Sequence, residues 1–314
     1  MKKWGAKNFI SCTKYNGKEY GFFPWEWAYA PNYSGVMLFN TALLNEGGVA
    51  LPYEYQENGT WNWANFETVL KTLQANMSHI AGFVPWDTGS YNDDGYYILM
   101  ANGLSAVEKD ENGKIIFGYD CSAGQDALNF LNRMYTSGLY SKSKVFSQGL
   151  SAFYTTGVSE ATSVVAKSDG TTAAAAAGFE YGLVSIPYGP NGNKDTVSAN
   201  VYWSTPMNFI LNQSENDAPV IGAVMEELFR PLDNVYNWKE YCQEFVFFHP
   251  EDYNNYIYML ENCNYDYSIQ LGESSNLDGY FGDVVLGNIS AAEAFEAVRD
   301  AANAAIAENV KTLD

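Results

Sequence analysis

The chain has 314 residues, 47% of them apolar, and its 37 acidic residues against 17 lysine and arginine residues give a formal net charge of −20 at pH 7. Single cores stop growing near roughly 250–300 residues, so two lobes are expected. The negative charge disfavours binding to nucleic acid and to anionic lipid, and no run approaches the ~18 apolar residues that would span a bilayer.

The first residues, MKKWGAKNFISC, imitate part of a lipoprotein signal, because two lysines precede apolar residues and a cysteine. A signal peptide needs an apolar run of ~7–15 residues, and Gly5, Lys7 and Asn8 interrupt it here. We therefore predict no signal peptide in this chain.

Residues 15–40 are expected to form two strands joined by an aromatic connector. The Asn16-Gly17 pair indicates a tight turn before the first strand, and the second strand covers residues 36–39. The connector carries Trp-Glu-Trp at positions 25–27. Exposed rings on a loop are costly in water, so these rings either close over a core or line a binding site.

The segments that follow alternate between helical and strand patterns. Asn92-Asp93-Asp94-Gly95 resembles part of a calcium loop, but Ala101 stands where the bidentate glutamate belongs, so a helix N-terminus is expected there. Helices are predicted over residues 41–46, from a Thr60 cap to 74, over 96–101 and over 122–137, with a buried strand over 80–84 and a hairpin around residues 110–113.

The second half begins with a short helix and strand over residues 146–156 and another strand over 181–186. A Pro/Gly/Asn cluster at residues 187–192 then predicts a crossing between lobes. Ser290 with Glu293 forms a capping box. A strand-like stretch over 201–210 precedes predicted helices over residues 220–229, 238–248, 253–260 and 290–310.

Catalytic and metal motifs are missing from the sequence. The two histidines, His79 and His249, stand in no HExxH or triad pattern, and the four cysteines match no zinc or redox spacing. Free thiols are the expectation for the cysteines, with a Cys242–Cys263 bridge as the alternative. We predict no metal and no cofactor. A glycosidase pair drawn from Glu26, Asp87, Glu160 and Asp283 stays open, because sequence cannot pair carboxylates.

Aromatic residues make up 16% of the chain, including 24 tyrosines, and they recur on separate loops. Flat rings with polar handles suit stacking on sugars. The pattern predicts a cleft lined by Trp25, Trp27, Trp86, Tyr91, Trp203, Tyr280 and Phe281, although any one ring is more often core than ligand contact.

The order of motifs resembles the family 1 extracellular solute-binding proteins, which deliver sugars to ABC importers. The match covers essentially the whole chain, and each motif is weak by itself. The matching segments are residues 16–24 (NGKEYGFFP, the strand into the hinge), 38–40 (LFN), 60–63 (TWNW), 146–153 (FSQGLSAF, like F-x-x-G-x-A-A-M), 186–190 (IPYGP, like P-x-G-P) and 214–216 (SEN).

The resemblance implies an α/β, two-lobed periplasmic-binding-protein-like (type II) fold with a helix-rich C-terminus. Members carry a much longer segment before the hinge strand, so lobe one is expected to be incomplete. The expected parts are residues 1–35 (remnant of lobe one and first hinge strand), 36–188 (lobe two), 189–262 (return to lobe one) and 263–314 (C-terminal helices packing back on lobe two).

The resemblance also implies a function: non-catalytic binding of a sugar or oligosaccharide between the lobes, for an ABC permease, by an extracytoplasmic monomer that is not inserted in the membrane. A glycoside hydrolase using the same rings, and a non-binding fragment, are the alternatives. The family often has a tryptophan after the F-x-x-G segment, and Val158-Ser159-Glu160 lacks one. By position, the ligand residues would be Trp25, Glu26, Trp27, Trp86, Tyr91, Ser159, Glu160, Trp203, Tyr280 and Phe281.

Overall fold

A computed structural model describes most of the chain. The described residues are 14–15, 18–22, 33–85, 91–142, 146–158, 179–201, 208–209, 218–230, 238–247, 249–263, 266, 271 and 275–310. Within these ranges, no helix combines the length and apolar character needed to cross a membrane.

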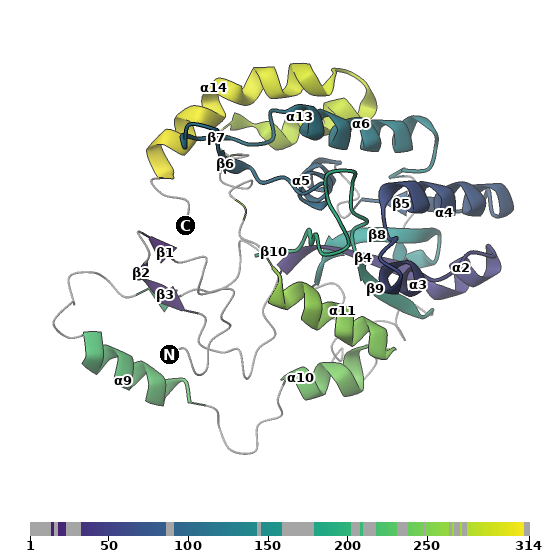
Figure 1. Ribbon diagram of the computed structural model, residues 1–314. Coiled ribbons are helices and arrows are strands. Elements are labelled where there is room, and N and C mark those ends of the chain that lie inside the picture. The colour runs from purple at the N-terminus through teal and green to yellow at the C-terminus, as the bar shows by residue number, and fades with distance from the viewer. Residues whose placement is uncertain are drawn as a thin grey trace.

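The centre of the fold is a mixed sheet in which β4 (Tyr33–Asn40) lies between β8 (Ser151–Gly157) and β9 (Tyr181–Ser185) (Figure 1). β8 and β9 run antiparallel to β4, whereas β5 (Ala81–Val84) pairs in parallel with β8. β10 (Asn200–Val201) runs antiparallel to the first two residues of β4. Every residue of β4 is buried, as expected for a strand covered on both faces.

Alternate residues of β4 enter two separate cores. Met37 and Phe39 belong to one core, and Val36 and Leu38 to the other, because side chains alternate across a strand. Figure 1 shows helices on both sides of the sheet. The first core is covered by α4 (Trp63–Asn76), α5 (Asn92–Ala101), α6 (Ser122–Thr136), α13 (Leu277–Leu286) and α14 (Ala291–Asn309), and the second by α11 (Pro250–Glu261) with the π turn Cys242–Val246.

The remaining elements are short. β1 and β2 pair antiparallel on either side of Asn16-Gly17, as the turn signal predicted. These elements are β1 (Lys14–Tyr15), β2 (Lys18–Glu19), β3 (Gly21–Phe22) paired with β11 (Asn208–Phe209), α2 (Thr41–Glu46), α3 (Pro52–Glu57), the hairpin β6 (Val107–Lys109) and β7 (Ile115–Phe117), the 3₁₀ turn Phe146–Gln148, α9 (Ala218–Leu228) and α10 (Trp238–Tyr241).

Helix caps explain where several predictions hold and where they shift. The capping box at Ser290 is confirmed, because its hydroxyl accepts from Glu293 N while the Glu293 carboxylate accepts from Ser290 N. The cap of α4 is Asn62 and not Thr60, since the Asn62 side chain accepts from Asn65 N at 3.1 Å. The acidic turn at residue 92 is a helix N-terminus, as expected, and begins α5 four residues before the predicted start of that helix.

Two helices, α3 and α13, were not predicted, and the predicted helix over residues 238–248 is α10 followed by a π turn. Pro52 at the first position of α3 has a fixed φ suited to a helix start, a signal that the sequence did contain. Among the described cysteines no disulfide forms, so the expected thiol state of Cys242 and Cys263 is confirmed.

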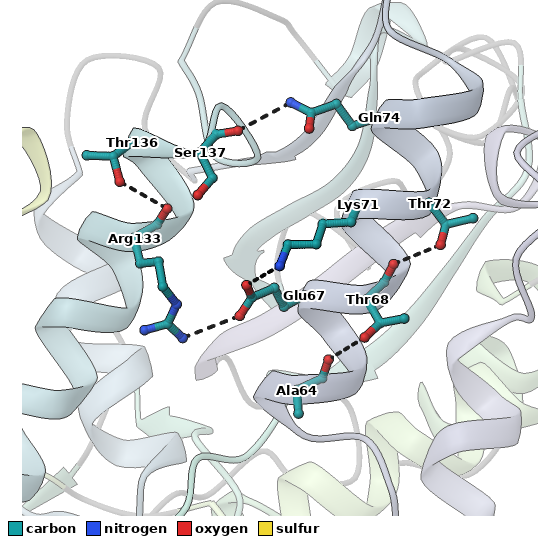
Figure 2. Close-up of polar contacts among 9 residues, drawn as sticks. All are labelled: Ala64, Glu67, Thr68, Lys71, Thr72, Gln74, Arg133, Thr136 and Ser137. Carbon is teal, nitrogen blue, oxygen red and sulfur yellow. Dashed lines mark hydrogen bonds and ion pairs between the residues drawn. The ribbon is translucent and has the colours of Figure 1, made fainter.

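A polar seam joins α4 to α6 at the surface (Figure 2). The Glu67 carboxylate accepts from Lys71 Nζ at 2.8 Å on its own helix and from Arg133 at 3.4 Å on α6, and Gln74 donates to the Ser137 carbonyl. Partial burial raises the pKa of Glu67, but the hydrogen bond from Lys71 and the charge of Arg133 outweigh it, so the pKa lies below its usual value.

Glu67→Gln is expected to lower the free energy of unfolding by no more than about 1 kcal/mol, because Lys71 and Arg133 are more than half exposed and exposed ion pairs are weak. Urea unfolding at low and high salt measures this, with Glu46→Gln at the exposed end of α2 as the matched control. A loss of several kcal/mol, or a loss insensitive to salt, would contradict the assignment of a screened surface seam.

Candidate functional site at one edge of the sheet

The ends of several strands gather at one edge of the main sheet. Because β5 and β8 are parallel, their carboxyl ends lie at the same edge, with Val84 opposite Tyr154. β4 runs the other way, so its first residues lie there too, and Ser34 pairs with Gly157. β10 ends beside them, where Val201 pairs with Tyr33. Ligands of open α/β sheets bind outside the carboxyl ends of strands, so this edge is the candidate site.

Seven of the ten predicted ligand residues lie outside the described residues, on segments that leave this edge. What the structure places is the strand end to which each segment is joined. Trp25, Glu26 and Trp27 precede β4 in the chain. Trp86 comes directly after β5 and Pro85, and Trp203 follows β10. Ser159 and Glu160 come directly after β8 and Val158. Chain connectivity therefore joins four segments that are far apart in sequence to strand ends at a single edge.

The segment after α6 adds a further parallel chain to this edge. Phe83 N donates to the Leu139 carbonyl at 3.1 Å, and Ser141 N donates to the Phe83 carbonyl at 3.0 Å. Tyr140 is thereby paired with Phe83, and the two rings stack with centroids 4.6 Å apart. Lys142 follows directly, so a cationic side chain also lies at the carboxyl end of β5.

A buried polar cluster lies behind this edge, where α5 begins. The carboxyl of Asp94, in the first turn of α5, accepts hydrogen bonds from the hydroxyls of Tyr140 and Thr155. Asp94 is 2% exposed. Burial raises the pKa of Asp94 to about 7, although the two hydroxyl donors act in the opposite direction. Sequence reasoning missed this cluster because its members come from three separate elements.

Tyr91 lies next to this cluster and is itself buried. Its ring contacts Tyr140 with centroids 4.9 Å apart, and Lys142 Nζ lies 4.5 Å from the centre of the Tyr91 ring. Burial raises the pKa of Tyr91 above its usual value, so the hydroxyl stays protonated at neutral pH. The predicted role of Tyr91 as an exposed ring of the cleft does not match this position, because only 4% of the residue is exposed.

Tyr280 and Phe281 lie within α13 and not on a loop. Phe281 is fully buried and meets the Tyr96 ring edge-on at 4.9 Å, and a Cβ at Gly95 would lie 2.3 Å from the Phe281 ring. Tyr280 packs against the same core as a half-buried residue. Phe281 therefore faces the core, which corrects its expected place on a cleft wall. The spacing of Leu277, Phe281, Val284 and Val285 was the helical signal.

A cavity of about 420 Å³ lies elsewhere, between the region after α5 and the end of α11. Its lining includes the carboxylates of Glu108, Asp195 and Asp266 and no aromatic side chain. Asp266 accepts from Ser105 Oγ, Ala106 N and Tyr119 OH, so this carboxylate is engaged by the protein. The cavity contains none of the predicted ligand residues and does not fit a ring-lined sugar site.

No group of three or more His, Cys, Asp or Glu side chains within the described ranges is arranged to hold a metal ion. The described part of the candidate site carries the Lys142 ammonium group at the edge, with the hydroxyls and the carboxyl of the Asp94 cluster buried behind it.

Comparison with known proteins gives the fold. No family model and no curated protein sequence matches the chain significantly. Solved structures do match over 98% of its length and 76–77% of theirs: UgpB from Mycobacterium tuberculosis in complex with glycerophosphocholine (TM-score 0.65, 14% identity), the sugar-binding protein MalE from Xanthomonas citri (0.64, 15%) and the cyclic α-maltosyl-1,6-maltose binding protein from Arthrobacter globiformis (0.63, 14%). The predicted periplasmic-binding-protein-like α/β fold is confirmed.

Proposed function

We propose that this chain binds a saccharide without catalysis, at the sheet edge where β4 begins and β5, β8 and β10 end. The observation that carries the proposal is the meeting of four strand ends at that edge, to each of which an aromatic or polar segment of the chain is joined. Binding residues commonly lie on loops that a rigid scaffold positions. Here the strand ends would be the scaffold, and the joined segments would supply the side chains.

The proposed ligand contacts are the indoles of Trp25, Trp27, Trp86 and Trp203, which stack on sugar faces, with Glu26, Ser159 and Glu160 as hydrogen-bond partners for hydroxyls. Tyr91 supports this layer from behind, and Phe281 is left out because it is buried. In this proposal the chain passes between the two lobes near residues 35, 188 and 262. Closure of one lobe on the other would sequester the ligand.

The likeness in fold supports a saccharide as the ligand class. Among the similar solved structures, one binds cyclic α-maltosyl-1,6-maltose, one is described as sugar-binding, and one, Lmo0181 from Listeria monocytogenes, is in complex with cycloalternan. UgpB holds glycerophosphocholine, so a polyol ester is the second ligand class to test. The chain would act outside the cytoplasm and deliver the bound saccharide to an ABC permease.

Titration with maltose, maltotetraose, cycloalternan and glycerophosphocholine tests the proposal. We expect one or more saccharides to quench tryptophan fluorescence and to stabilise the fold, by about 2.7 kcal/mol at a ligand concentration of 100 Kd. Calorimetry gives the affinity. Trp86→Ala should weaken binding at least about tenfold, as loss of a central aromatic contact does. Trp63→Phe is the control, since Trp63 stacks on Phe130 inside the core.

Three results would point elsewhere. Steady release of reducing sugar would favour the glycoside hydrolase alternative. No binding by a folded chain, with binding restored in a lengthened chain, would favour the non-binding fragment. Equal affinity in the Trp86→Ala variant and the wild type would remove Trp86 from the site.

A further inference from the structure

The carboxyl of Asp94 joins three elements at the candidate edge. It is part of the first turn of α5, it accepts from Thr155 on β8, and it accepts from Tyr140 on the chain segment paired with β5. Thr155 and Tyr140 are 61 and 46 residues away from Asp94 in sequence. The three side chains are almost fully buried.

A buried carboxyl is tolerated only while its hydrogen-bond donors stay in place. Asp94 therefore ties the start of α5 to two strand ends, and any movement of that turn away from the sheet separates the carboxyl from its donors. The ring of Tyr140 transmits the same constraint to Tyr91, because the two rings are in contact. The position at a helix N-terminus favours the negative form slightly, by the helix dipole.

We propose that Asp94 is a positioning residue for the ligand edge, which holds Tyr91 and the first turn of α5 against the ends of β8 and of the segment that contains Tyr140. The identity of the edge as a ligand site rests on the proposed function. The positioning itself rests on the contacts of Asp94 alone, and Asp94 need not touch a ligand.

The hold of Asp94 on the first turn of α5 depends on pH, because its carboxyl can lose a proton. The groups that act on the Asp94 carboxyl are the hydroxyls of Thr155 and Tyr140 and, more distantly, the carboxylate of Asp93 on the same turn. Burial and the Asp94 carboxyl raise the pKa of Tyr140 well above its usual value, so Tyr140 remains a donor throughout. Burial raises the pKa of Asp94 to about 7, so opening of the turn to water releases a proton between pH about 4 and 7.

Amide hydrogen exchange of residues 91–96, corrected for the intrinsic effect of pH, tests the proposal without a ligand. We expect protection of this turn to fall as the pH rises from about 4 to about 7, by up to about tenfold per pH unit. Above pH about 7 the protection should level off. The amides of α14 serve as the internal reference for global unfolding. Asp94→Asn should abolish the pH dependence, whereas Asp93→Asn should retain it. Thr155→Val removes a donor to the charged form and should move the levelling point to higher pH.

An unchanged pH dependence in Asp94→Asn would overturn the proposal. So would protection of residues 91–96 equal to that of α14 at every pH, because the turn would then open only by global unfolding, which also exposes Asp94. If Asp94→Asn fails to fold, Thr155→Val decides, and an unmoved levelling point overturns the proposal. A chain that passes these tests but binds no saccharide would refute the proposed function and leave the positioning role intact.

Discussion

Phe153→Ala is expected to lower the free energy of unfolding by about 3–5 kcal/mol, the usual range for truncating a fully buried phenylalanine. Phe153 lies in the middle of β8 and has no exposed surface. Its ring contacts Trp61, Phe66 and Phe39, with centroids 6.0, 5.2 and 6.4 Å away.

The reason for the large effect is that one fully buried ring packs against aromatic side chains from several elements at once. Trp61 precedes α4, Phe39 lies on β4, and both meet the same face of β8 through Phe153. A strand at the centre of a sheet cannot shift to fill the space left by a ring, so the transfer term and the cavity term add.

Guanidinium unfolding followed by circular dichroism measures this loss. Leu286→Ala at the end of α13 is the matched control, because Leu286 is 42% exposed and its truncation should change stability by about 0.5 kcal/mol. A similar loss in both variants would contradict the central place of β8 in the core.

The regular elements were largely predictable because local periodicity sets them. Ala127, Leu128, Leu131 and Met134 follow the helical spacing of α6 and are all buried, as that spacing predicts. α13 was overlooked for a different reason. Tyr280 and Phe281 were interpreted as loop rings, and a fully buried phenylalanine cannot be told from an exposed one by residue type alone.

The candidate edge was only half predictable. Aromatic residues on separate segments indicated a site, but the meeting of the strand ends that these segments join depends on the order of β10, β4, β8 and β5, which is a tertiary property. The Asp94 cluster was beyond sequence reasoning, because a carboxylate at a helix N-terminus is ordinarily a surface residue. Only the parallel pairing near β5 brings Tyr140 to it.

Two buried carboxyls predict how stability depends on pH. Burial raises the pKa of Asp94 to about 7 and that of Asp252 to about 6, against a usual value near 4. Asp252, in the first turn of α11, accepts from Tyr53 OH and from Leu183 N, so it joins α11 to α3 and β9.

Between pH about 4 and 7 the folded chain holds protons that the unfolded chain has released, so stability is fully present below pH about 4 and falls as pH rises. The loss levels off above about 6 for Asp252 and above about 7 for Asp94. At 1.36 kcal/mol per pKa unit, the contribution lost is up to about 4 kcal/mol for Asp94 and about 3 kcal/mol for Asp252.

Urea unfolding at intervals from pH 4 to pH 8 measures the slope. Asp94→Asn and Asp252→Asn should each flatten the fall, because asparagine does not titrate, and the comparison uses slopes and not absolute stabilities. The net charge of −20 also disfavours the folded state as carboxyls ionise, and Asp93→Asn controls for that effect by removing a charge from the same turn as Asp94. These carboxyls would be ionised in the folded chain if its stability rose between pH 4 and 7. The same would hold if stability fell with pH as steeply in Asp94→Asn and in Asp252→Asn as in the wild type.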